Sequence, residues 1–90
     1  MNATASRPRL LAALLAWLNR RMAPPGVRIT RDTLLFEGGM INSIRILELI
    51  AWTERAIERR IDDVDIQMSN FRTPARIAAV FGTGDRDDQP

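Results

Sequence analysis

One stretch of the sequence joins a loop to the start of an amphipathic helix: Phe36-Glu37-Gly38-Gly39-Met40-Ile41-Asn42-Ser43-Ile44. Its two glycines permit backbone angles that other residues resist. The helical spacing of apolar residues begins directly after it. The hydroxyl of Ser43 is therefore expected at the start of a helix, where unpaired backbone N–H groups and the positive end of the helix dipole favour an attached phosphate.

The segment that follows has the period of an amphipathic helix, predicted from Ser43 to Arg60. The residues expected to face the core are Ile46, Leu47, Leu49, Ile50, Ile57 and Ile61. The opposite face is expected to carry Ile44, Arg45, Glu48, Trp52, Arg55 and Arg59. Ile44 and Trp52 are large apolar groups among charged ones, which is typical of a partner-binding surface. Packing of Trp52 against the core and a solvated Glu48–Arg55 pair are the simpler alternatives.

A first helix is predicted from Pro8 to Met22, with the proline suited to its first turn. Its apolar face consists of Leu10, Leu11, Leu14, Leu15, Leu18 and Met22, with Trp17 at the margin. The unbroken apolar run, residues 10–18, is much shorter than the roughly 20 residues of a membrane span. The run resembles the core of a signal peptide. However, Arg20 and Arg21 follow it and no small-residue cleavage site does, so we expect a cytoplasmic protein.

The remaining sequence predicts a long connection and a short last helix. Residues 23–42 form the connection, pinned to the core by apolar side chains: Val27, Ile29, Leu34, Leu35 and Phe36. An acidic turn at Asp62–Asp65 precedes a short helical turn over Ile66–Phe71. Thr73-Pro74 is a typical helix start, and Gly82 ends that helix. We therefore expect one all-α domain over residues 8–82, with three main helices plus one short helix, between flexible ends at residues 1–7 and 83–90.

The composition excludes most catalytic chemistry. The 90 residues include no cysteine, histidine, tyrosine or lysine, and all 13 basic residues are arginines. The chain therefore lacks a thiol nucleophile, the usual general base, a Schiff-base amine and the commonest metal ligands, and neither a catalytic nor a metal site is predicted. Six arginines and no acid fall in residues 1–31, whereas residues 32–90 hold seven arginines and all 11 acids. The net charge of +2 is no signature of nucleic-acid binding.

The order and lengths of these elements, with the serine where it stands, resemble the acyl carrier protein family, the phosphopantetheine-bearing carriers. The residues that carry the resemblance are Asp32-Thr33-Leu34-Leu35-Phe36-Glu37-Gly38-Gly39-Met40-Ile41-Asn42-Ser43-Ile44, then Leu47-Glu48-Leu49-Ile50, then Asn70-Phe71-Arg72-Thr73. The family pattern before the second helix reads roughly Asp-Ser-Leu. The resemblance covers residues 10–81 in layout and is specific from Asp32 to Phe81. It implies a small acyl-carrier-like helical bundle.

The resemblance also implies a function. Ser43 would carry a 4'-phosphopantetheine arm from coenzyme A, whose thiol holds an acyl or aminoacyl group as a thioester. Asn42, Ile44 and Met40 would be recognised by the phosphopantetheinyl transferase or the arm. Further partners of the monomeric carrier would be a dedicated acyl- or aminoacyl-activating ligase and a downstream transferase or synthase. The residues expected to bind these partners are Arg45, Glu48, Trp52 and Arg55.

Departures from the family pattern point to a specialised carrier. Asn42 stands where aspartate is usual, and it keeps the capping oxygen but loses the charge. Arg45 occupies a position that is often acidic in fatty-acid carriers, and Arg55, Arg59 and Arg60 alter a helix that those carriers keep acidic. Such charges would repel the basic surfaces of housekeeping synthases. The cargo stays open between an amino acid, an unusual acyl chain and a polyketide.

Two other functions stay open at this level. The chain could be an unmodified carrier-like protein that binds a partner through the Ile44/Glu48/Trp52 face, with Ser43 acting only as a helix cap. It could also be a small nucleic-acid-binding domain that uses its arginines. If an arm is present, a groove between the second helix and the last two helices could receive it. Core packing explains the candidate lining residues equally well: Leu47, Ile50, Phe71 and Ile77.

Overall fold

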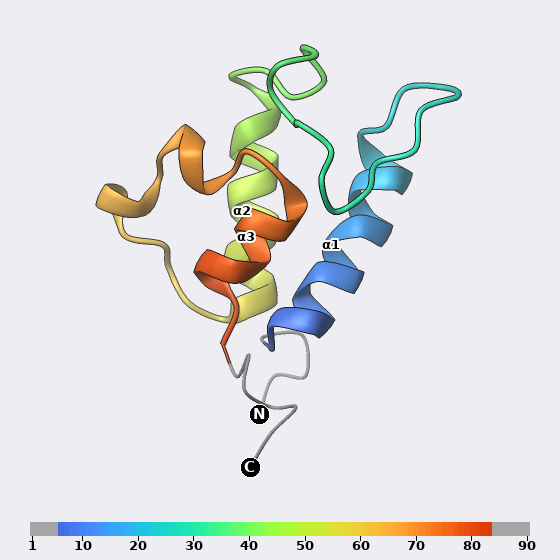
Figure 1. Cartoon of the computed structure of the whole chain (residues 1–90). Coiled ribbons are helices and arrows are strands. Elements are labelled where there is room, and N and C mark those ends of the chain that lie inside the picture. The colour runs from blue at the N-terminus through green and yellow to red at the C-terminus, as the bar shows by residue number, and fades with distance from the viewer. Residues whose placement is uncertain (1–5, 84–90) are drawn as a thin grey trace.

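The part of the chain that the structure describes forms three α-helices and two short 3₁₀ turns (Figure 1). The computed structural model describes residues 6–83. Its elements are α1 (Arg7–Arg21), α2 (Arg45–Ile57), η1 (Asp63–Asp65), η2 (Met68–Asn70) and α3 (Pro74–Phe81). Over this range the β-structure is limited to one isolated bridge between Ser6 and Thr83. The predicted all-α bundle with three main helices is confirmed, with two 3₁₀ turns where one short helix was expected. Of the ends predicted to be flexible, residues 1–5 and 84–90 lie outside the described residues.

α1 forms one wall of the core and packs chiefly against α3. Pro8 lies in its first turn, where a helix needs no N–H donor, and Arg20 and Arg21 lie in its last turn, beside the negative end of the dipole. Leucines four residues apart fall on one face of the helix and are fully buried: Leu10, Leu14 and Leu18. The observed bounds differ from the predicted ones by one residue at each end, which is the usual uncertainty of helix ends.

The core collects apolar side chains from all three α-helices and from both connections. Its members are Leu10, Leu14, Leu18, Met22, Ile29, Leu35, Ile41, Leu49, Ile57, Ile61, Phe71, Ile77 and Phe81. The rings of Phe71 and Phe81 meet at a tilt of 32° with 5.1 Å between centroids, within the range favoured by aromatic pairs. The segment before α3 is thereby fixed to its last turn.

α2 ends earlier than the sequence predicts. Glu58 adopts a left-handed backbone conformation with φ of 59°, which stops the helix after Ile57. The carboxylate of Glu54 then accepts the N–H of Ile61 at 2.8 Å and holds the turn that follows. Apolar periodicity continues to Ile61, so it extended the prediction past the true end.

The prediction that Leu47 faces the core is wrong, because 65% of this residue is exposed. The buried line of α2 runs through Leu49, Thr53 and Ile57. At 100° per residue, Leu47 lies about 120° away from Thr53 around the helix. The hydroxyl of Thr53 donates to the carbonyl of Leu49 at 2.8 Å, so a polar side chain can lie at the centre of the buried face. A pattern that counts only apolar residues misses this position.

The connection between α1 and α2 is anchored by hydrogen bonds to its backbone groups. The side-chain amide of Asn19 accepts the N–H of Ile29 and donates to its carbonyl, both at 2.8 Å. The N–H of Leu35 donates to the carbonyl of Arg72 at 2.9 Å. Ile29 and Leu35 are buried as predicted, whereas Val27 and Leu34 are 43% and 44% exposed and do not pin the loop. The connection crosses the end of the bundle at which α2 begins (Figure 1).

α3 begins as its sequence predicts. The hydroxyl of Thr73 accepts the N–H of Arg76 at 3.0 Å, and Pro74 takes the first helical position. The helix ends at Gly82, where a Cβ would lie 2.8 Å from the Cγ of Arg7. Glycine thus permits a close approach between the end of α3 and the start of α1.

Residues 6–83 contain neither a membrane-spanning helix nor a cluster of metal-binding side chains. No helix between residues 6 and 83 has the length and apolar character that crossing a bilayer requires. In the same range, no three acidic, histidine or cysteine side chains are grouped so that they could hold a metal ion.

Candidate attachment site at the start of α2

Asn42 is the residue that caps α2. Its Oδ1 accepts the N–H of Ile44 at 3.0 Å and the N–H of Arg45 at 2.9 Å. Its carbonyl oxygen accepts the N–H of Ile46 at 2.9 Å, which is the hydrogen bond of a helical turn. The turn therefore starts at Asn42, before the regular helix, and the side chain satisfies two of the N–H groups that a helix start leaves unpaired. The expectation that asparagine keeps the capping oxygen is confirmed.

Ser43 lies directly after the cap, at the first position of this turn. Its side chain is exposed, and its hydroxyl makes no hydrogen bond with any part of the chain that the structure describes. Because Asn42 does the capping, the hydroxyl of Ser43 is not needed to cap α2 or to hold together residues 6–83 by a hydrogen bond. A group attached to its Oγ would lie beside the positive end of α2.

The loop before Ser43 is held in place on both sides. Gly39 has a positive φ of 76° and its N–H closes a turn onto the carbonyl of Phe36 at 2.9 Å. Ile41 is 3% exposed and its N–H donates to the carbonyl of Leu35 at 3.1 Å. Ser43 therefore lies two residues after the buried side chain of Ile41, which fixes the backbone of this segment to the core. Met40 is half-buried and packs against this core.

An apolar groove of about 330 Å³ opens beside Ser43. Its lining residues are Phe36, Ile41, Asn42, Ser43, Ile46, Ile66, Gln67, Met68 and Phe71. The groove thus lies between the start of α2 and the segment around η2. Figure 1 shows that segment on the side of α2 away from α1. Of the four lining residues expected from the sequence, only Phe71 belongs to it. Ile77 is fully buried in the core, and Leu47 lies on the outer surface.

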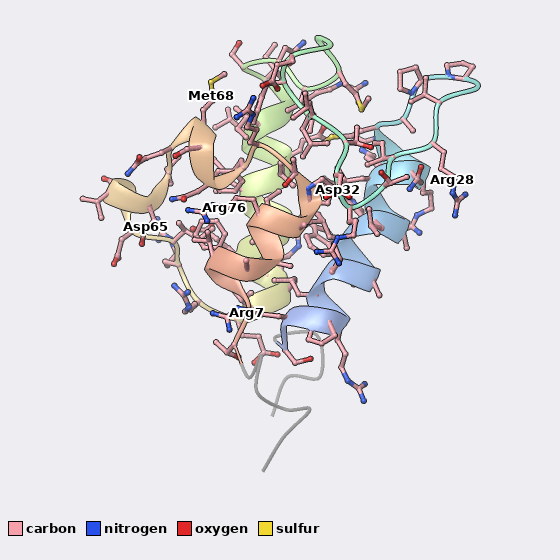
Figure 2. All side chains as sticks on the ribbon, in the orientation of Figure 1. Arg7, Arg28, Asp32, Asp65, Met68 and Arg76 are labelled. Carbon is pink, nitrogen blue, oxygen red and sulfur yellow. The ribbon has the colours of Figure 1, made fainter. Side chains whose placement is uncertain are left out.

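Three exposed apolar side chains, which we term the apolar rim, lie around this end of the molecule: Ile44, Leu47 and Met68. They are 73%, 65% and 67% exposed. Figure 2 places Met68 towards the end of the bundle at which α2 begins. The exposure of Ile44 was predicted. Leu47 was assigned to the core, and Met68 lies in a segment too short to have a readable period.

Two residues predicted on the outer face of α2 contact α1. The ring of Trp52 stacks on Trp17 with 5.4 Å between centroids and 18° between planes, and both rings pack against the core. The carboxylate of Glu48 accepts a hydrogen bond from Arg21 of α1 at 2.6 Å, so its partner is Arg21 and not Arg55. The alternative that Trp52 packs as part of the core describes its position.

The four residues predicted to bind partners lie on one side of α2, within about 80° of one another at 100° per residue, but two of them contact α1. Glu48 and Trp52 are directed towards α1. Arg45 is half-buried at the first turn of α2, and Arg55 is exposed nearer to its C-terminal end. The apolar rim includes Ile44, the exposed residue that directly follows Ser43.

The chain is similar to a known biosynthetic protein. The chain is 37% identical over 78 residues to lincomycin biosynthesis protein LmbN of Streptomyces lincolnensis. The match covers 81% of this chain and 27% of the relative, so the chain corresponds to about a quarter of that protein's length. No protein-family model matches the chain, and no solved structure matches it significantly.

Proposed function

We propose that this chain is a carrier protein of the acyl carrier family, with a 4'-phosphopantetheine arm attached to Ser43. One observation carries the proposal. The Ser43 hydroxyl is exposed at the start of a helix, unused by the fold, and beside an apolar groove. A serine that served only as a cap would accept backbone N–H groups, and that task belongs to Asn42.

The residues around Ser43 fit such an arm. The start of α2 favours the negative charge of a phosphodiester by roughly 0.3–1 kcal/mol. The groove offers an apolar lining with the amide of Gln67 as a polar group, which suits a chain of methylene and amide units. When attached, the arm supplies a terminal thiol that holds an acyl or aminoacyl group as a thioester, a group that no side chain of this cysteine-free sequence can form.

The chain's own residues then have three tasks. Asn42 fixes the first turn of α2 and thereby the direction of the Ser43 side chain. Ile41 ties that turn to the core, so the attachment point does not drift. The apolar rim gives partner enzymes a surface to bind next to the attachment point. The proposal assigns no catalytic step to this protein.

The relative supports a place in specialised metabolism. Its name assigns it to the biosynthesis of lincomycin. We infer that the present chain serves a dedicated pathway of secondary metabolism. Its partners there would be a phosphopantetheinyl transferase, an acyl- or aminoacyl-activating ligase and a downstream transferase or synthase.

The test is arm attachment measured by intact-protein mass. Incubation with coenzyme A and a phosphopantetheinyl transferase, general or from the source organism, is expected to add one arm. Ser43→Ala is expected to abolish the addition, and the matched control Ser69→Ala, at another exposed serine, to retain it. We expect Asn42→Asp to raise the rate with a general transferase. A chain that stays bare with every transferase, including its own host's, refutes the proposal.

An unmodified interaction protein is the second candidate, and one observation favours it. Ile44 and Leu47 are exposed on α2 beside Ser43, and large apolar side chains in such positions mark protein-binding surfaces. Natively purified protein distinguishes the two functions. If it always lacks the arm while Ile44→Ala abolishes its complex with a partner, the interaction protein is the better description.

A further inference from the structure

A second groove runs along the outer side of α1, away from Ser43. Its larger part, about 570 Å³, lies between α1 and residues 28–31. Its smaller part, about 390 Å³, continues to the start of α1 and reaches α3. The two parts share Leu11 and Arg31, so they adjoin. We term the two together the α1 groove.

The length of the α1 groove matches a helix. Its α1 lining extends from Arg7 to Asn19, which at 1.5 Å per residue is about 18 Å or three helical turns. Leu11 and Leu15 are half-buried in its floor, and Ala12 and Ala16 are exposed beside them. An apolar strip of this length accepts the side chains that an amphipathic helix places at every third or fourth residue.

The charge of the α1 groove has one sign. Arg7, Arg28 and Arg31 line it, and among residues 6–83 no aspartate or glutamate belongs to the lining of either part. Figure 2 places Arg28 at the outer margin of the molecule and Arg7 at the start of α1. Asp32 is the acid that pairs with Arg31, at 3.9 Å and with both side chains more than half exposed, which is a weak interaction. Carboxylates of a bound partner would therefore meet an arginine-lined margin.

We propose that the α1 groove binds an acidic amphipathic helix of a partner protein. Apolar side chains of that helix would lie over Leu11 and Leu15, and its carboxylates would face Arg28 and Arg31. None of the described residues lines both this groove and the one beside Ser43. A partner bound here leaves the Ser43 hydroxyl accessible. Binding in the α1 groove therefore neither blocks nor requires modification of Ser43. The inference does not rest on the proposed function.

Two synthetic peptides test this proposal. The first is a helical eighteen-residue peptide with leucines at every third or fourth position and glutamates elsewhere, and the second has lysines in place of the glutamates. The wild-type chain, labelled with ¹⁵N, is expected to bind the glutamate peptide roughly 10-fold more tightly than the lysine peptide, and less tightly as salt is raised. Amide shifts are expected in α1 and residues 28–31, with the resonance of Ser43 unchanged.

Charge reversal supplies the decisive comparison. Arg28→Glu/Arg31→Glu is expected to reverse the preference, so that the lysine peptide binds more tightly. The matched control Arg55→Glu/Arg59→Glu changes the net charge equally at exposed positions outside the groove and is expected to keep the wild-type preference. Thermal unfolding of each variant establishes that it is folded. A second variant, Ala12→Glu/Ala16→Glu, places acids on exposed helix positions in the groove. It is expected to bind the glutamate peptide more weakly than the wild type does.

Three results would overturn the proposal. The first is no binding of the glutamate peptide by the wild-type chain at about 1 mM, a concentration at which a weak helix-in-groove contact is detectable. The second is that the Arg55→Glu/Arg59→Glu control loses its preference for the glutamate peptide as fully as Arg28→Glu/Arg31→Glu does, which would mean that only the net charge matters. The third is binding of phosphatidylglycerol vesicles through α1 without binding of the peptide, which would assign the groove to a membrane surface.

Discussion

The division of roles between Asn42 and Ser43 predicts that replacing each by alanine has a different effect on stability. Asn42→Ala removes the oxygen that accepts two N–H groups, at 3.0 and 2.9 Å. Asn42 is exposed, so water replaces part of the loss, and the free energy of unfolding should fall by about 1 kcal/mol, within the 0.5–2 kcal/mol range of helix caps. The Ser43 hydroxyl makes no hydrogen bond among the described residues. Ser43→Ala should therefore change the free energy of unfolding by less than about 0.5 kcal/mol.

Urea unfolding followed by tryptophan fluorescence measures both effects. The two tryptophans of the chain form the stack between α1 and α2, so their emission reports the packing of these helices. A loss of 1 kcal/mol corresponds to a fall in Tm of roughly 4–8 °C for a domain of this size. Asn42→Asp keeps the accepting oxygen and adds charge at the positive end of α2, so it should be as stable as the wild type or up to about 1 kcal/mol more stable.

Two outcomes would refute this reasoning. A Ser43→Ala variant as unstable as Asn42→Ala would mean that the serine hydroxyl caps the helix. An Asn42→Asp variant as unstable as Asn42→Ala would mean that the side-chain oxygen of residue 42 is not the acceptor. The first outcome would also remove the main support for attachment at Ser43.

Two further predictions concern the packing of α1. Gly82→Ala should destabilise the protein by about 1–3 kcal/mol in thermal unfolding, because the added Cβ would lie 2.6 Å from the carbonyl oxygen of Ala78 and 2.8 Å from the Cγ of Arg7; an unchanged Tm would contradict this close approach. Trp52→Ala should cost about 1–3 kcal/mol and shift the emission of Trp17, since it removes a half-buried ring stacked at 5.4 Å. A variant as stable as the wild type with unchanged Trp17 emission would indicate that Trp52 lies on the outer surface and does not stack on Trp17.

Local sequence determined the secondary structure wherever a signal and its effect lie within one turn. Thr73-Pro74 specified both the cap and the first position of α3, because a hydroxyl three residues before an N–H reaches it in any helix. The spacing of Leu10, Leu14 and Leu18 specified the buried side of α1 in the same way. Asn42 was recognised as a source of a capping oxygen, because this depends only on the residues that follow it.

Tertiary structure decided which side chains are free to act. Leu47 and Ile46 are equally apolar neighbours, and only the position of the segment around η2 beside α2 makes one exposed and the other a groove wall. Trp52 and Glu48 are directed towards α1 because Trp17 and Arg21 face them from a helix distant in sequence. The periodicity of one helix gives the angles between its own side chains around the helix axis. It does not show which neighbouring element covers each side of that helix. The sequence by itself therefore determined the approximate positions of the helices along the chain and placed Ser43 at the start of α2, and the packing of α1, α3 and η2 around α2 decided the surfaces that surround it.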